Sequence, residues 1–186
     1  WQRVKDGEPI GFDDFKLTIE RFGYPEDCYF NFSYSPVLDE DGVAQGVLVT
    51  FVETTARIRN ERRLALLDEL TQATRALSDP AEVMRTTSAM LGRYLGVNRC
   101  AYAHVHDDQD TFDLIGDYNE GVDSIVGRYR FTDFGAAVHT LMLADAPYVD
   151  PDVEHDPATR GTDLSPYHRT QVRAVICLPV HKNGPF

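Results

Sequence analysis

Residues 53–77 read ETTARIRNERRLALLDELTQATRAL, and the rest of the chain is organised around this stretch. It contains no glycine or proline and is rich in alanine, leucine, arginine and glutamate, which are strong helix formers. At ~1.5 Å per residue, about 24 helical residues would span roughly 36 Å, a length that suits a connector between two domains. Six residues recur at alternating steps of three and four and form a seam like that of a short coiled coil: Asn60, Arg63, Leu67, Leu70, Thr74 and Leu77.

We therefore expect a linker helix at residues 55–78, and its seam predicts a homodimer in which two copies of the helix pair. The polar end of the seam, at Asn60 and Arg63, predicts weaker packing than the leucine end. The alternative is a helix that packs on its own domain. Residues 1–54 have the patterns of a β-sheet, and residues 79–186 have those of a second, mixed unit.

Composition predicts an ordinary soluble globular protein: of 186 residues, 42% are hydrophobic and 26% are charged. The net charge of −12 would repel nucleic acid. The chain has no apolar run of membrane-spanning length and no secretion signal, so no membrane contact is expected. Cys28, Cys100 and Cys177 are widely spaced and form no zinc-type pair, which indicates free thiols in a cytoplasmic protein.

The first unit carries strand patterns at residues 15–19, 29–35 and 43–52, with a turn at Gly42 between the last two. Short connections predict an antiparallel meander with one aromatic face. The residues before it are too few and too polar to cover that face. We interpret this unit as cut at its amino end.

Residues 29–63 resemble the carboxy-terminal half of a PAS domain. The resemblance rests on S-P-V at 35–37, a D-x-x-G turn ending at Gly42, Gly46, and E-T-T at 53–55 before the helix. The earlier strands and short helices that wall the ligand cavity in that family have no counterpart here. No flavin-type cysteine motif or haem-binding histidine can be assigned.

The second unit begins with a helix-start signal, Asp79-Pro80 followed by Glu82, and an apolar stripe that Gly96 ends. The elements expected after this helix are strands at 99–106, 111–118, 129–131, 148–149 and 172–181 (the last one buried), a helix capped by Asp133, a helical turn at 165–170 and a hairpin turn at 182–184.

This order of elements, an acidic D-P loop at 150–162 and a V-R-A-x-[IV]-C-x-P-[LV] strand at 172–180 resemble a GAF domain that lacks its last strand. The expected fold class is α+β: an antiparallel PAS-like sheet, a long connecting helix, and a GAF-like antiparallel sheet flanked by helices. PAS, helix and GAF in this order resemble the input half of bacterial two-component sensor histidine kinases. The resemblance implies a kinase whose catalytic domain is absent here, so the segment itself is not expected to be an enzyme.

No catalytic residue is assigned, because nucleotide-binding glycine motifs are missing and His139 lacks the acidic neighbour of a phosphoacceptor. His104 and His106 alternate on one strand and share a face, with Asp108 nearby, which could begin a metal site. No third ligand is evident from the spacing, and half-exposed strand histidines are the simpler interpretation. We therefore assign no metal ligand.

A small-molecule pocket is the remaining functional hypothesis. The residues nearest the cavity that the GAF resemblance implies are Tyr102, Tyr118, Arg128, Phe134, Tyr167 and His168. The simpler interpretation makes several of them core residues. In tetrapyrrole-binding GAF domains a Cys-His pair occupies the position that Tyr167-His168 resembles here. Tyrosine cannot form the thioether, so a covalent bilin is disfavoured and a non-covalent small molecule stays open, although no cofactor is required.

Three hypotheses follow. The first is a cytoplasmic sensory and signal-transmitting segment of a two-component sensor histidine kinase. It senses a small molecule or partner and relays the signal through the dimeric helix to the output domain of the same polypeptide. The second is a chromophore- or cofactor-binding photoreceptor module without covalent attachment. The third is a purely structural dimerisation segment.

Overall fold

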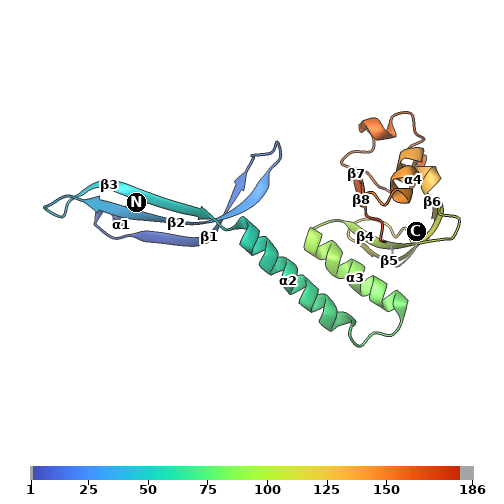
Figure 1. The fold of residues 1–186 in the computed structure, drawn as a ribbon, viewed down its shortest axis with the longest axis horizontal. Helices are drawn as coiled ribbons and strands as arrows, with labels where there is room; N and C mark the ends of the chain where they lie inside the picture. The colour runs from blue at the N-terminus through green and yellow to red at the C-terminus, as the bar shows by residue number, and fades with distance from the viewer. Residues whose placement is uncertain (1, 181–186) are drawn as a thin grey trace. The chain divides into compact units, whose positions relative to one another are not determined.

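A computed structural model describes residues 2–180 and divides the chain into two compact units, Trp1–Asp68 and Glu69–Phe186. Helices and antiparallel sheets alternate along the chain in an α+β fold (Figure 1), which confirms the fold class expected from the sequence. Within the described residues, no helix has both the length and the apolarity needed to cross a membrane.

The first unit is built on an antiparallel sheet of order β1-β2-β3, formed by β1 (Ile10–Ile19), β2 (Glu26–Leu38) and β3 (Ala44–Glu53). β1 begins earlier than the alternation at 15–19 predicts, because the strand continues through a bulge between Phe12 and Phe15. At this bulge Asp14 takes a φ of +49°, and its N–H donates to Asn31 Oδ1 at 2.8 Å. A short helix, α1 (Gln2–Lys5), packs Val4 against the sheet.

One face of this sheet is aromatic, as the alternation of β2 predicts. Phe12, Phe32 and Phe51 lie opposite one another in a single row across the three strands. The rings of Phe12 and Phe32 stack with their centroids 4.8 Å apart, whereas Phe51 is 71% exposed. The row is therefore packed at its β1 end and open at its β3 end.

α2 (Thr55–Thr74) follows β3 directly. It begins at Thr55, which is buried and whose Oγ1 accepts a hydrogen bond from the Tyr29 N–H at 2.9 Å. It ends at Thr74, whose hydroxyl donates to the Leu70 carbonyl at 2.7 Å. The helix is four residues shorter than the predicted 55–78, and Asp79, the residue directly before Pro80, caps the next helix instead.

The second unit places α3 (Pro80–Leu95) against β4 (Arg99–Val105) and β5 (Thr111–Asn119). The start and end of α3 agree with the sequence prediction. Asp79 Oδ1 accepts a hydrogen bond from the Ala81 N–H at 3.1 Å, and Gly96 takes a φ of +65°. β6 (Gly127–Arg130) pairs with β5 to complete a sheet of order β4-β5-β6.

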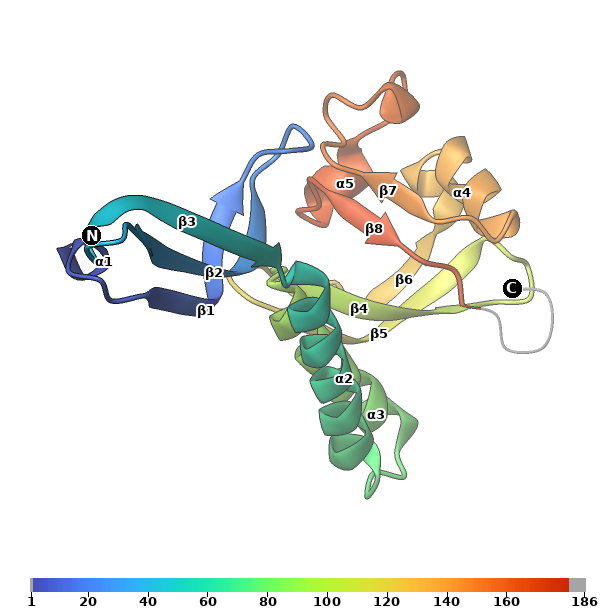
Figure 2. The same ribbon diagram turned by 60° about the vertical axis from the view of Figure 1, so that its left-hand side comes forward.

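The remaining elements cover the other face of this sheet around a core of Phe112, Phe131, Val138, Met142 and Tyr148. Figure 2 shows β7 and β8, which pair antiparallel, side by side. These elements are η1 (Phe131–Phe134), α4 (Ala136–Leu143), β7 (Tyr148–Asp150), η2 (Pro157–Thr159), α5 (Ser165–Arg169) and β8 (Val175–Cys177).

Two local predictions in this unit are wrong. Asp133 does not cap a helix but lies within η1, because Gly135, with a φ of +119°, takes the N-cap position of α4. The strand expected at 172–181 is only three residues long and is not buried, since β8 pairs with β7 alone and Ile176 is 70% exposed. The hairpin turn expected at 182–184 lies outside the described residues.

Candidate functional site

A cavity of about 340 Å³ opens in the second unit between β6, η1 and α5. Its lining combines aromatic, charged and small polar side chains: Arg128, Tyr129, Asp133, Phe134, Pro166, Arg169 and Thr170. Small-molecule sites usually have mostly apolar walls with a few placed polar groups. This lining is more polar than that, and the volume of the cavity falls at the lower end of their usual range.

The aromatic wall of this cavity is formed by Tyr129 and Phe134, and the buried Tyr167 supports it through contacts with Phe134. The Tyr167 ring meets that of Phe134 edge-on with the centroids 5.2 Å apart, and its hydroxyl donates to the Phe134 carbonyl at 2.8 Å. Tyr167 is buried, and burial raises the pKa of its hydroxyl. On the other side, the Tyr129 hydroxyl donates to the Ile125 carbonyl at 3.0 Å. These bonds fix the wall to α5 and to the chain that enters β6.

Tyr167 also connects the cavity to the interior. Its hydroxyl lies 3.1 Å from that of Tyr148, which donates to Asp150 Oδ2 at 2.9 Å. The two hydroxyls make three close oxygen–oxygen contacts, counting the one to Phe134, but have only two protons, so at any moment one of the three contacts has no hydrogen bond. Burial is the main reason that the pKa of Tyr148 lies far above its ordinary value.

One of the two arginines in the cavity is already paired. Arg128 donates from Nε and Nη2 to the two oxygens of Asp113, at 2.7 and 2.9 Å. These bonds, with a second contribution from His106 at 2.9 Å, hold the pKa of the Asp113 carboxyl well below its ordinary value. The charge of Arg128 is therefore largely balanced within the protein.

The other two charged residues of the cavity have weaker partners, since Asp133 interacts with the charge of Arg130, and Arg169 with that of Asp163, through space alone. Among the described residues, neither Asp133 nor Arg169 makes a hydrogen bond or an ion pair through its side chain, and both are exposed. A guanidinium and a carboxylate whose hydrogen-bonding atoms are not used by the described residues can each bind a complementary group of a ligand.

Arg128 and Phe134 are the two sequence-predicted candidates that line the cavity. Tyr118 instead lies against Gly92 of α3, and its hydroxyl donates to Glu120 at 2.7 Å. Tyr102 is 38% exposed on β4, opposite Ile115. Tyr167 lies beneath the cavity wall.

The last candidate, His168, is exposed, and its Nε2 lies 3.7 Å from Glu154 Oε1 rather than in the cavity. Five lining residues were not proposed from the sequence: Tyr129, Asp133, Pro166, Arg169 and Thr170. Three of these belong to the segment around His168, so the helical turn expected at 165–170 could have indicated them as lining residues.

The cysteines and strand histidines lie away from this cavity. Cys28, Cys100 and Cys177 are free, as expected, and burial raises the pKa of Cys177 to about 11, which disfavours its thiolate. The rings of His104 and His106 are neighbours at 5.9 Å. His106 binds Asp113 rather than Asp108.

The fold of the second unit, a sheet with α3 on one face, is similar to that of GAF domains. No protein-family model and no curated protein sequence matches the chain. Among solved structures, the GAF domain of a phosphoenolpyruvate-protein phosphotransferase from Coxiella burnetii is similar, with a TM-score of 0.52 and 18% identity over 67% of this chain and 73% of that one.

A second similar structure is the chromophore-binding domain of the Stigmatella aurantiaca bacteriophytochrome (a Thr→His mutant in the Pr state). The TM-score is 0.50 and the identity 16% over 100% of this chain. The match covers 64% of that chain, less than two thirds of its length. At such identities the similarity is one of fold.

Proposed function

We propose that this chain is a sensory and signal-transmitting segment whose second unit binds a small molecule in the cavity between β6, η1 and α5. The observation that carries this proposal is an aromatic wall beside two exposed charged groups, Asp133 and Arg169, neither of which makes a side-chain hydrogen bond or ion pair among the described residues. A ligand with an anionic group for Arg169, a hydrogen-bond donor for Asp133 and a planar apolar body for Phe134 fits this lining.

The proposed signal path runs through α2. Its first turns are tied to the sheet of the first unit by ion pairs of Arg57 with Asp14 and of Arg59 with Glu26. Arg62 lies over the Tyr29 ring at 4.9 Å. A rearrangement of this sheet would therefore rotate or shift α2, and in a homodimer it would change how the two copies of α2 pack.

The wider context extends this proposal. The first unit would be the carboxy-terminal half of a PAS domain, and the whole segment would belong to a cytoplasmic two-component sensor histidine kinase. The kinase domain would be the output domain of the same polypeptide, and the segment itself would transmit the signal without catalysing a reaction.

Native mass spectrometry of the purified chain tests the proposal. We expect a dimer that carries an additional small mass, and Arg169→Gln should lose that mass. Arg160→Gln is the matched control, because Arg160 is an exposed arginine of the same unit outside the cavity lining. A dimer without additional mass would contradict ligand binding in this cavity. A monomer would contradict signalling through paired helices.

A non-covalent chromophore is the second candidate, favoured by the fold similarity to the bacteriophytochrome chromophore-binding domain. No cysteine is among the lining residues, and Tyr167 is buried beneath them, so a pigment would be held without a thioether. If the chain is supplied with a linear tetrapyrrole, a visible absorption band should appear, and denaturation should release the pigment. The absence of an absorption band would exclude this candidate.

A further inference from the structure

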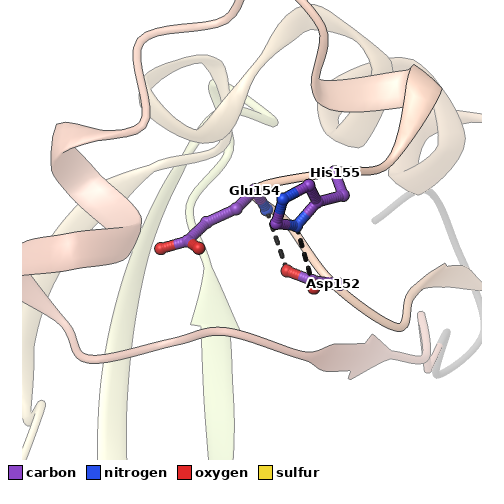
Figure 3. A group of neighbouring side chains, drawn as sticks. All are labelled: Asp152, Glu154 and His155. Carbon is purple, nitrogen blue, oxygen red and sulfur yellow. Dashed lines mark hydrogen bonds and ion pairs between the residues drawn. The ribbon is translucent and has the colours of Figure 1, made fainter.

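The loop after β7 gathers metal-ligating side chains that the proposed function does not use. Asp152, Glu154 and His155 each offer one ligand atom, and these atoms all lie within 4.8 Å of one another. Figure 3 shows the His155 imidazole beside the Asp152 carboxylate, with 3.0 Å between Nδ1 and Oδ2.

A fourth potential ligand comes from a different element. His168 of α5 has its Nε2 3.7 Å from Glu154 Oε1. The three loop side chains whose ligand atoms all lie within 4.8 Å of one another supply one imidazole and two carboxylates, and His168 approaches Glu154 from another segment with a second imidazole. This mixture of nitrogen and oxygen ligands suits zinc and related divalent transition metals better than magnesium or calcium.

The backbone that carries the loop ligands is anchored. Val153 is buried, its N–H donates to the Arg173 carbonyl at 2.9 Å, and its own carbonyl accepts from Thr159 Oγ1 at 2.8 Å. The Asp152 N–H donates to Asp150 Oδ1 at 3.0 Å, and Asp150 is buried. Because the loop is already ordered, a metal ion would need to order only side chains.

Binding an ion requires the side chains to move together, because the loop ligand atoms lie up to 4.8 Å apart and His168 lies outside this group. Bonds of about 2.1 Å place tetrahedral ligand atoms roughly 3.4 Å apart. The side chains of His155 and His168 are 73% and 60% exposed and so are free to close this distance. Arg173 is the competing cation, since its Nη2 lies 3.5 Å from Asp152 Oδ2 and 3.8 Å from Glu154 Oε2. These contacts are long and exposed, and such ion pairs are weak.

We propose that Asp152, Glu154, His155 and His168 form a binding site for a divalent transition-metal ion of the zinc type, with Arg173 as the residue the ion displaces. The ion would tie His168 to the anchored loop and so hold α5 in place. Pro166 and Arg169 of the same short helix line the cavity described above, so metal and ligand would each favour binding of the other. This coupling rests on the proposed ligand-binding function, whereas the metal site itself does not.

Titration of the full chain, stripped with chelator, tests the site with two probes. Isothermal calorimetry with Zn²⁺ should give one ion per chain, and Co²⁺ should give a visible absorption band with the intensity of a tetrahedral complex. His155→Ala and His168→Ala should each weaken Zn²⁺ binding at least about tenfold. Arg173→Gln should strengthen it, because the competing charge is removed.

His104→Ala is the matched control, since His104 is an exposed histidine of β4 in the same unit and should leave Zn²⁺ affinity unchanged. The proposal is overturned if the chain binds no Zn²⁺, if His155→Ala binds as tightly as the parent chain, or if His104→Ala weakens binding equally. Unchanged affinity in His168→Ala would overturn the role of α5 and the coupling to the cavity. None of these outcomes depends on whether the cavity holds a ligand.

Discussion

Gly92 lies where α3 crosses the Tyr118 ring of β5. A Cβ atom at this position would come within 2.7 Å of Tyr118 Cε1 and closer still to Cδ1. Alanine favours a helix over glycine by about 0.5–1 kcal/mol, whereas overpacking costs about 1–3 kcal/mol. We expect Gly92→Ala to lower the free energy of unfolding by about 1–2 kcal/mol in urea melts followed by circular dichroism.

The Tyr118→Ala background supplies the control, because it removes the ring that the new methyl group would meet. There, Gly92→Ala should be neutral or stabilising. If Gly92→Ala stabilised the parent chain as well, the close packing of α3 on β5 would be contradicted.

Glu53, the last residue of β3, gives a pH dependence with a definite sign. Arg21 donates from both terminal nitrogens to its carboxylate, at 2.9 and 2.8 Å. These bonds, followed by one from Thr55, lower the pKa of Glu53 from 4.5 to about 2. Because the pKa in the folded state lies below that in the unfolded state, the stabilisation is present above pH 4.5 and is lost as the pH falls toward 2.

Glu53→Gln should therefore reduce the loss of stability between pH 4.5 and 2. Urea melts of both proteins at several pH values across this window measure the difference. The carboxylate is exposed, so the change in slope should also shrink as salt concentration rises. An unchanged slope in Glu53→Gln would show that Arg21 does not hold this carboxylate in the folded state.

At the scale of elements, the exposed side chains of α2 allow a test of whether this helix is a dimer contact. Leu67 lies at the centre of the predicted seam and is 48% exposed within the single chain. If this face pairs with a second copy, Leu67→Asp should convert a dimer into a monomer in sedimentation or light-scattering measurements. An introduced carboxylate buried between two helices is strongly destabilising.

Ala65→Asp is the matched control, because it places the same side chain on the opposite face of α2, two residues away. It should leave the mass in solution unchanged. If neither substitution alters the mass, pairing through the predicted seam is ruled out. The helix covers only part of the predicted seam, since Leu77 follows the end of α2 at Thr74.

The elements predicted well are those whose signals are local. Asp79 acts through a hydrogen bond to a residue two positions away, and Pro80 and Gly96 act through their own backbone geometry, so the bounds of α3 follow from the sequence alone. The turn before β3 is similar, since Asp39 accepts hydrogen bonds from the N–H groups of Asp41 and Val43. The length of β8 depends instead on which strand pairs with it, and an apolar run does not specify a partner.

The candidate site was predicted less completely, because it also depends on which elements pack against one another. Arg128 and Phe134 were identified, but alternation along a strand does not tell which face of the sheet the cavity occupies. Tyr118 accordingly lies against α3. Arg169 was not identified from the sequence, because only the folded chain places it in the lining of the same cavity as Phe134 and Asp133.

At the scale of the whole molecule, the net charge of −12 sets a condition on assembly. Two chains that associate as the proposed homodimer bring together two bodies of this charge, and their mutual repulsion opposes association. The proposed seam is itself largely uncharged, since Leu67, Leu70 and Thr74 form its carboxy-terminal part. The attraction between the helices would therefore be mostly apolar and insensitive to salt, while the repulsion is screened by it.

We therefore expect the dimer to become tighter as salt concentration rises. The Debye length falls from about 10 Å at 0.1 M to about 3 Å at 1 M, so repulsion between distant acidic surfaces is largely removed across this range. Sedimentation equilibrium in NaCl from 0.05 to 0.5 M, roughly a threefold change in screening length, measures the dissociation constant. A dimer that instead weakens with salt would show that ion pairs between the two chains, such as those available to Arg63, dominate over the apolar seam.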